Sequence, residues 1–460
     1  MNNRIVTSLC VLCAILCAVQ RAPAQGSLTP SGPPGPTMLT LSQIEPRTPI
    51  TNAAAVTISA SGSYYLTANI TVTNGSAITI TANQVTLDLN GFTLSSTEAS
   101  PTGTGILLAG GDTDITILNG HIKGGVTNSG GVYGGNGFAN GIYYSGSIPV
   151  NVRVSGVSVS GCLLYGIYLG TGNSTVVESC AVQTIGVYGI FATSVAHSTA
   201  VQCGTIAIFA STASDCYASG TGTQGLVAIS ANNCIGICSG SGTAVNAANA
   251  SNCTGQSAGS GPALSATTAN NCQGKNTGSG DGLDAVTANN CQGQCTGGGY
   301  GLNASQTATG CYGTSATGIG LSALAANNCT GQSGSSGIGL SATQIATGCY
   351  GLSGTGTGLV TYVANNCYGR SNGSSDGLYA NIANNCFGES GGGTGLDCGI
   401  ANNCTGYSVD TGTGLNATVS ATGCYGFVAG GPGPGLFAQN GNFCFGIPSV
   451  SVPGNNYNMP

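Results

Sequence analysis

Cysteine recurs at a nearly constant interval through the second half of the chain, and this interval limits the possible folds more than any other feature. Self-similarity at a fixed period of roughly 20 to 50 residues is the signature of repeat architectures, in which each repeat is one unit of a stack. The period therefore predicts a solenoid with one coil per repeat. Thirteen cysteines follow one another at a nearly even spacing of about 19 residues, at Cys216, Cys234, Cys253, Cys272, Cys291, Cys311, Cys329, Cys349, Cys367, Cys386, Cys404, Cys424 and Cys444.

Each repeat reads approximately Gly-Leu-x-Ala, then Ala-Asn-Asn-Cys-x-Gly, then a loop of serine, glycine and threonine. The apolar stretches are too short for helices and alternate with polar residues, which is typical of strands that face a narrow interior. The residue before the cysteine is Asn in eight repeats, Gly in three and Asp in one. Because these residues tolerate a positive φ, the sequence predicts a left-handed bend once per coil. Phe443 departs from this pattern in the last repeat, where atypical residues are expected.

The first half carries longer repeats with better strand formers, such as Val85–Leu94 and Ile115–Lys123. A left-handed β-helix would place an aliphatic residue at every sixth position, and the repeats lack that spacing. We therefore predict an all-β, right-handed parallel β-helix solenoid, with wide N-terminal coils tapering to coils of about 19 residues that carry an internal cysteine ladder. The expected order is a signal peptide at 1–24, a Pro-rich linker and N-terminal cap at 25–55, irregular longer coils at 56–215, regular coils at 216–447 and a C-terminal tail at 448–460.

The first residues predict secretion. Arg4 precedes an apolar run from Ile5 to Val19, and Ala22-Pro23-Ala24 supplies a small-residue cleavage site, which together are typical of a signal peptide. Without Arg4 and Arg21 of this leader, five basic residues stand against 13 acidic ones, a net charge of −8. Such a surface repels nucleic acid. No later apolar run is long enough to span a bilayer, so we expect a secreted or cell-surface protein without membrane insertion.

The role of the stacked cysteines has three possible interpretations. An oxidising compartment favours disulfides, and neighbouring coils would bring the Cα atoms within range, but their parallel Cβ vectors fit a disulfide poorly. Reduced thiols acting as small core residues fit a narrow interior better, and this is the interpretation we favour. A thiolate metal site has no support in ligand spacing, so no metal is expected. Cys238, Cys295 and Cys398 lie off the ladder.

Three N-terminal segments carry a family resemblance. Ile44–Ile50, Gly62–Leu66 and Val85–Phe92 resemble secreted bacterial right-handed β-helix proteins of the pectate-lyase-like superfamily, over about residues 40 to 200. The resemblance implies the fold. Its members include polysaccharide lyases and hydrolases, together with many proteins that have no known reaction.

Cleavage of a polysaccharide needs an acid/base pair, or Ca²⁺ carboxylates with a basic residue that takes the proton. Charged residues after position 216 are scattered over many coils, whereas the N-terminal coils are denser in them. His121 and Lys123 alternate around Ile122 and share an outer face if Ile122 points inward. With Arg153, they are the candidate catalytic residues.

The long array with only 4% charged residues favours a noncatalytic extracellular β-helix that acts as a structural or surface-interaction protein and contacts polysaccharide or other cell-surface material, without a cofactor. The alternative is a carbohydrate-active enzyme, a polysaccharide lyase or glycoside hydrolase, with its site on the N-terminal coils. Ca²⁺ is expected only under that alternative. Binding to ice would require aligned threonine columns, and the Thr-Gly-Thr segments are too intermittent for it.

Overall fold

The computed structural model describes residues 41–448, 450–451 and 456–457. The predicted signal peptide at 1–24 lies outside the described residues, as do residues 25–40 of the predicted linker and most of the predicted tail. The chain divides into one unit of Met1–Arg47 and a second of Thr48–Pro460. In the described part of the first unit, one helical turn, α2 (Leu41–Ile44), precedes an ion pair in which Arg47 lies 2.8 Å from Glu45.

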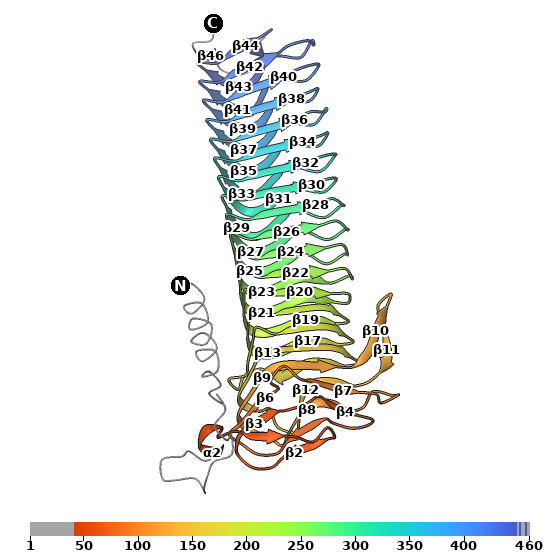
Figure 1. Ribbon diagram of the computed structural model, residues 1–460. Helices are drawn as coiled ribbons and strands as arrows, with labels where there is room; N and C mark the ends of the chain where they lie inside the picture. Colours follow the sequence, from red (N-terminus) through yellow and green to blue (C-terminus); the bar gives the residue numbers. More distant parts are fainter. Residues whose placement is uncertain (1–40, 449, 452–455, 458–460) are drawn as a thin grey trace, which may run out of the picture. The chain divides into compact units, whose positions relative to one another are not determined.

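The second unit is a parallel β-helix, which confirms the predicted all-β solenoid. Forty-four strands join in one continuous sheet, and the coils stack in a single column from β2 to β44 (Figure 1). A two-stranded antiparallel hairpin, β10 (Gly125–Ser129) and β11 (Val132–Asn136), leaves this column as a side arm. The hydroxyl of Tyr133 donates to the carbonyl of Gln202 at 2.8 Å, so the arm is tied to a later coil.

Each coil has three strand segments, which we call faces A, B and C in chain order. In the first coils, face A consists of β2 (Val56–Ile58), β5 (Ile78–Ile80), β8 (Thr104–Ala109), β12 (Asn140–Ser145) and β14 (Tyr165–Gly170); face B of β1 (Thr48–Ile50), β3 (Gly62–Leu66), β6 (Val85–Asp88) and β15 (Val176–Glu178); and face C of β4 (Ile70–Val72), β7 (Thr93–Ser96) and β16 (Ala181–Ile185). Two longer strands, β9 (Thr113–Lys123) and β13 (Val150–Cys162), run from face B into face C.

From β17 onward, one strand covers faces A and B and a short strand forms face C. The former are β17 (Tyr188–Ala196), β19 (Ile206–Ser214), β21 (Gln224–Asn232), β23 (Thr243–Ser251), β25 (Leu264–Asn270), β27 (Leu283–Asn289), β29 (Leu302–Thr309), β31 (Leu321–Asn327), β33 (Leu340–Thr347), β35 (Leu359–Asn365), β37 (Leu378–Asn384), β39 (Leu396–Asn402), β41 (Leu415–Thr422) and β43 (Leu436–Asn442). The short strands are β18 (Thr199–Cys203), β20 (Tyr217–Gly220), β22 (Ile235–Cys238), β24 (Thr254–Ser257), β26 (Gln273–Asn276), β28 (Gln292–Cys295), β30 (Tyr312–Ser315), β32 (Thr330–Ser333), β34 (Tyr350–Ser353), β36 (Tyr368–Ser371), β38 (Phe387–Ser390), β40 (Thr405–Ser408), β42 (Tyr425–Val428) and β44 (Phe445–Ile447), and β45 (Val450–Ser451) and β46 (Asn456–Tyr457) pair with β43.

A left-handed residue separates face B from face C in every regular coil, as the sequence predicts. The residue before each of the 13 periodic cysteines has a φ between 51° and 62°. Phe443, which departs from the pattern in residue type, has the same left-handed conformation, with a φ of 51°. The coil geometry holds even where the side chain disfavours that conformation.

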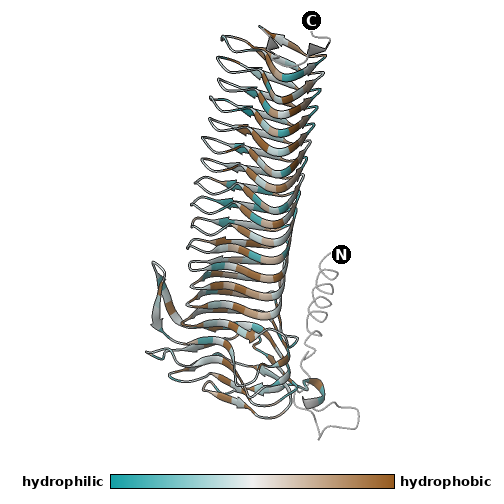
Figure 2. Cartoon of the chain, turned by 180° about the vertical axis from the view of Figure 1, so that it is seen from behind, coloured by the Kyte–Doolittle hydropathy of each residue, from teal (hydrophilic) through white to brown (hydrophobic). Residues whose placement is uncertain are grey.

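The interior narrows along the chain because the inward residues become smaller. The first coils bury Ile, Leu and Val, whereas each coil from Leu264 onward buries one leucine, small residues and a cysteine. Hydrophobic and hydrophilic residues alternate along the strands (Figure 2). In the narrow part, a Cβ added to Gly282 on face A would lie 2.4 Å from the backbone nitrogen of Gln294 on face C. Glycine is therefore required where two backbones meet across the interior.

The periodic cysteines form hydrogen-bonded rungs inside the corner between faces B and C. The backbone N–H of Cys272 donates to the sulfur of Cys291 in the next coil at 3.5 Å. The thiol of Cys291 faces the carbonyl of Asn289 at 3.2 Å and the carbonyl of Ala269 at 3.3 Å. The rungs therefore satisfy an amide that would otherwise be buried without an acceptor.

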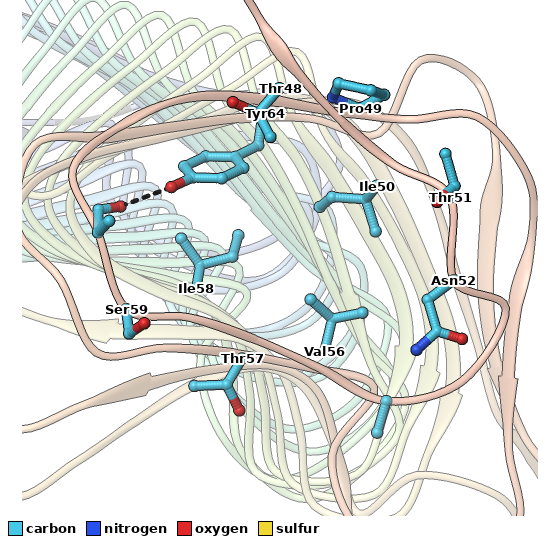
Figure 3. Close-up of a pocket in the computed structure, with 12 residues that line it drawn as sticks. Thr48, Pro49, Ile50, Thr51, Asn52, Val56, Thr57, Ile58, Ser59 and Tyr64 are labelled. Carbon is cyan, nitrogen blue, oxygen red and sulfur yellow. Dashed lines mark hydrogen bonds between the residues drawn. The ribbon is translucent and has the colours of Figure 1, made fainter.

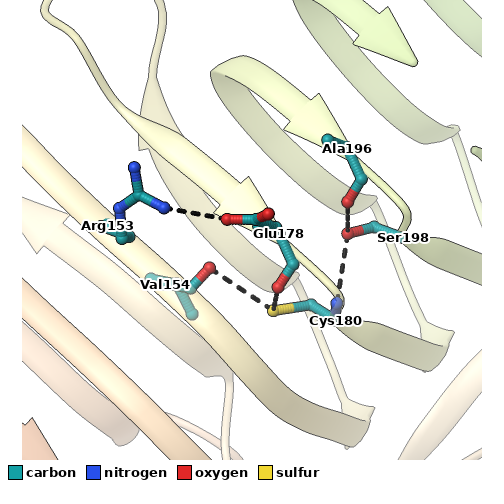
Figure 4. Close-up of polar contacts among 6 residues, drawn as sticks. All are labelled: Arg153, Val154, Glu178, Cys180, Ala196 and Ser198. Atoms are coloured by element: carbon teal, nitrogen blue, oxygen red, sulfur yellow. Dashed lines mark hydrogen bonds and ion pairs between the residues drawn. The ribbon is translucent and has the colours of Figure 1, made fainter. Parts of the chain in front are cut away.

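The same corner column extends beyond the 13 periodic cysteines. Cys180 donates its backbone N–H to the hydroxyl oxygen of Ser198 at 3.2 Å, and this hydroxyl donates to the carbonyl of Ala196 at 2.7 Å (Figure 4). A serine thus replaces the thiol in one coil. All 19 cysteines in the described part of the chain are free and buried. Burial raises the pKa of Cys162 and Cys203 to about 12, which keeps these thiols protonated at neutral pH.

Candidate functional site

His121 and Lys123, two of the candidate catalytic residues, lie together at the end of β9 on face C. Both are exposed on either side of Ile122, which is 1% exposed. The residues paired with them in the neighbouring coils are Thr93, Ser95, Ser158 and Ser160. Lys123 lines a shallow groove of about 440 Å³ with Asn69, Thr71 and Thr93. These in-register partners offer hydroxyl groups and no carboxylate.

Arg153, the third candidate, lies on a different face. It precedes the left-handed bend at Gly156, so it belongs to face B whereas His121 and Lys123 belong to face C. Its guanidinium pairs with Glu178 at 2.8 Å, with both side chains more than a third exposed (Figure 4). Such an exposed pair contributes little to stability. The structure therefore brings His121 and Lys123 together on face C and places Arg153 on face B, on the other side of the bend.

The acidic residues of the early coils are engaged in amide contacts at the bends. Asp88 accepts a hydrogen bond from the backbone of Asn90 at 2.8 Å, and Asp114 accepts one from the side chain of Asn151 at 2.6 Å. Among the described residues, no group of three or more His, Cys, Asp or Glu side chains could hold a metal ion. These contacts give the carboxylates a structural role in the turns.

A hollow of about 490 Å³ lies at the first coil, between β1, β2 and the start of β3 (Figure 3). Ile50, Val56 and Ile58 line it, and the hydroxyl of Tyr64 donates to the carbonyl of Ala60 at 2.9 Å. Its lining residues include no carboxylate, histidine or cation. The hollow therefore offers no acid/base chemistry.

A cluster of aromatic rings on the outside of face A is the most distinctive surface of the early coils. We call this cluster the tyrosine platform. Strand pairing places the rings in two neighbouring columns, because equivalent residues of parallel strands lie about 4.8 Å apart. One column is Tyr143, Tyr168, Phe191 and Phe209, the second is Tyr165 and Tyr188, and Tyr144 lies beside them.

The rings of the tyrosine platform contact one another continuously across four coils. Tyr165 and Tyr168 are the closest pair, with centroids 4.4 Å apart, and Tyr143 stacks on Tyr165 at 5.7 Å with an interplanar angle of 5°. Phe191 meets Phe209 edge to face at 5.0 Å. All seven rings are half-buried. Mutual packing fixes their positions, so the surface that they form is preorganised.

The tyrosine platform is uncharged. Burial raises the pKa of Tyr168 to about 12 and also raises the pKa of Tyr144 and Tyr165, so these phenols keep their protons at neutral pH and can donate hydrogen bonds. Along the column that contains Tyr143, the described strands from β8 to β25 present no charged residue, and the first is Asp284 on β27. The surface therefore combines apolar ring area with neutral polar groups.

The tyrosine platform was not predicted from the sequence, although the sequence contains a signal for it. The segments Gly141-Ile142-Tyr143, Gly166-Ile167-Tyr168 and Gly189-Ile190-Phe191 repeat one pattern in which the isoleucine is buried and the ring points outward. The repeated aromatic residue at the outward position was the clue. Whether these aromatic residues contact one another depends on the register between coils.

Comparison with known proteins does not assign the chain to a family. No family model and no curated protein matches it. Two solved structures are similar, both A-modules of mannuronan C-5 epimerases from Azotobacter vinelandii. AlgE6 matches with 10% identity over 85% of this chain and 89% of that chain at a TM-score of 0.25, and AlgE4 with 14% identity over 86% and 91% at a TM-score of 0.23. At these TM-scores, the similarity carries no argument about this chain.

Proposed function

We propose that the protein is a secreted, noncatalytic β-helix that binds a neutral polysaccharide on the tyrosine platform. The stacked, half-buried rings of Tyr143, Tyr165, Tyr168 and Tyr188 are the observation that carries this proposal. The C–H face of a pyranose packs on aromatic rings, while phenol and amide groups at the ring edges exchange hydrogen bonds with sugar hydroxyls. No cofactor is needed for such binding.

The length and charge of the tyrosine platform define the class of ligand. The column from Tyr143 to Phe209 covers three coil steps, or about 14 Å, which suits a short stretch of a linear chain. Polyanionic polysaccharides need cations in register with their carboxylates, and this column offers none within the strands described. The tyrosine platform therefore suits neutral chains better than uronates.

Residues outside the tyrosine platform support the noncatalytic assignment over the enzyme alternative. His121 and Lys123 share a face but have hydroxyl neighbours, and Arg153 is paired with Glu178 on another face.

In the described part of the chain, no helix is long and apolar enough to cross a bilayer. We propose the extracellular space or the cell surface as the place where the ligand is met.

Binding to neutral polysaccharides, such as a glucan or a galactomannan, tests the proposal by affinity electrophoresis. We expect the affinity of the tyrosine platform itself to fall at least tenfold in the double variant Tyr165→Ser and Tyr168→Ser, because two rings at roughly 1 kcal/mol each are lost. Tyr379→Ser is the matched control, since Tyr379 is a 50% exposed tyrosine on face A between Val360 and Asp397, outside the ring cluster.

The same panel, extended to uronate polymers, tests the enzyme alternative. Cleavage would appear as new reducing ends or unsaturated products. Activity that disappears in His121→Ala or Lys123→Ala would overturn the noncatalytic assignment. Unchanged binding by the double tyrosine variant would overturn the assignment of the ligand to the tyrosine platform.

A further inference from the structure

A second group of aromatic residues lies on the outside of face C in the last coils. We call it the C-terminal aromatic band. Two outward columns contribute to it, because the first and third residues of each short strand point away from the interior. The members are Tyr350, Tyr368, Phe387, Tyr425 and Phe445 in one column and Tyr407 and Phe427 in the other.

The rings of this band pack in three groups, and Tyr425 stacks on Phe445 at 5.7 Å in the last of them. Tyr350 and Tyr368 have centroids 5.0 Å apart, and Tyr368 meets Phe387 at 5.1 Å. Where Thr405 interrupts the first column, Tyr407 of the same strand continues the band and stacks on Phe427 at 5.4 Å. The band therefore crosses six consecutive coils. Five of the six residues in its first column are aromatic.

The band is electrically neutral because its charges compensate each other. Arg370 lies 3.6 Å from Glu389 in the next coil, and the hydroxyl of Tyr368 donates to the same carboxylate. Burial, together with this hydrogen bond, raises the pKa of Tyr368 to about 12. One internally paired cation leaves nothing to attract a polyanion or an acidic protein, whereas paired charges and phenols offer hydrogen-bond partners to an uncharged hydroxylated ligand.

We propose that the C-terminal aromatic band is a second site for a neutral polysaccharide, so that one protein bridges two polysaccharide chains. This inference rests on the proposed function and adds a second site to it. The two sites lie on different faces of one continuous sheet. Seven coil steps separate Phe209 from the coil of Tyr350, or about 34 Å. A short chain segment on one site cannot reach the other.

A second copy of the protein is a less suitable occupant of the band. Tyr425 is 36% and Phe445 45% exposed, and the other five rings are half-buried. Together they expose at most roughly 500 Å² when a full ring side chain counts for about 200 Å², below the ~800 Å² per partner of a stable protein interface. A chain of sugars needs only a narrow track of rings.

Bridging is measured with beads that carry an immobilised neutral glucan and with the same glucan in soluble, fluorescent form. We expect the full chain to recruit the fluorescent glucan to the beads. The double variant Tyr368→Thr and Phe387→Thr should bind the beads but lose at least 90% of the recruitment, with half the wild-type number of glucan sites per protein. Threonine occupies this outward position naturally at Thr330 and Thr405, so these variants preserve the fold.

Tyr362→Thr is the control, because Tyr362 is 57% exposed on β35 and belongs to neither group of rings. Recruitment by the Tyr368/Phe387 variant at the wild-type level would overturn the second site while leaving the proposed function intact. Failure of the wild-type protein to bind any neutral polysaccharide would overturn both. A wild-type dimer that the Tyr368/Phe387 variant converts to a monomer, measured by sedimentation, would identify the band as a protein interface and also overturn the inference.

Discussion

The early coils and the cysteine coils fill their interiors with different types of residue. In the early coils, Ile78, Ile106, Ile117 and Ile142 fill a wide interior and are fully buried. In the cysteine coils, leucine, alanine and cysteine fill a thin one, and glycines bring the backbones of faces A and C into contact. The early coils therefore depend on buried apolar area, and the cysteine coils depend on backbone ladders and close approach.

The two aromatic surfaces also lie on different kinds of coil. The tyrosine platform lies on face A of wide coils, where four coils of decreasing length still pair in register. The C-terminal aromatic band lies on face C of uniform coils, where short strands of three or four residues carry the rings. Outward aromatic rings thus pack against one another on both kinds of coil, while the interiors follow different rules.

The largest expected effect contrasts a core isoleucine with a ladder thiol. Ile117→Ala should lower the free energy of unfolding by about 2–5 kcal/mol, because it leaves a cavity in the wide interior. Cys329→Ala should cost only about 1–2 kcal/mol, since it removes a smaller group and the acceptor of the Cys311 amide. Denaturant unfolding, followed by circular dichroism, measures both.

Cys329→Ser is the control for this contrast. Ser198 accepts from the amide of Cys180 in the preceding coil and donates to the carbonyl of Ala196 in its own coil, so the serine variant should be more stable than Cys329→Ala. A Cys329→Ala variant as damaging as Ile117→Ala would show that both regions depend equally on buried side-chain volume.

The next effect tests the backbone contact in the thin coils. A Cβ at Gly339 would lie 2.4 Å from the nitrogen of Leu352, so Gly339→Ala should cost about 2–3 kcal/mol by overpacking. Gly298→Ala, whose Cβ would meet only Thr317 at 3.7 Å, should leave stability nearly unchanged. Hydrogen exchange should show lost protection in β33 and its neighbouring coils for Gly339→Ala alone. Equal protection in the two variants would show that the close approach of the backbones at Gly339 does not limit the residue type there.

Local residue types carried enough information to predict the solenoid and its bends. The even spacing of the cysteines set the coil, and Asn, Gly or Asp before the cysteine marked the left-handed corner, with Asn328 at a φ of 51° as one example. The alternation of His121 and Lys123 around a buried Ile122 could also be predicted from the two-residue period of a strand.

The register between coils of unequal length could not be predicted in this way. Inward residues that pair across coils are farther apart in the sequence from Ile106 to Ile142 than from Ile142 to Ile167. The hairpin β10–β11 accounts for the longer interval, and no local pattern aligns Tyr143 with Tyr168 across such a change. For the same reason, the position of Arg153 beyond the bend at Gly156 became visible only in the folded chain.

The smallest effect tests whether the bends of the thin coils are set by residue type or imposed by the stack. Phe443 holds a φ of 51° and is 63% exposed, so its ring contributes little burial and its backbone is strained. Phe443→Asn should therefore raise the free energy of unfolding by about 1 kcal/mol, the approximate cost of a left-handed conformation for an ordinary residue. Asn328→Ala should lower it by a similar amount, while Asn328→Gly should change it little because Gly310 and Gly348 occupy the same corner. Thermal melting of the three variants measures this, and a lower melting temperature for Phe443→Asn would mean that contacts of the ring outweigh the strain at the last bend.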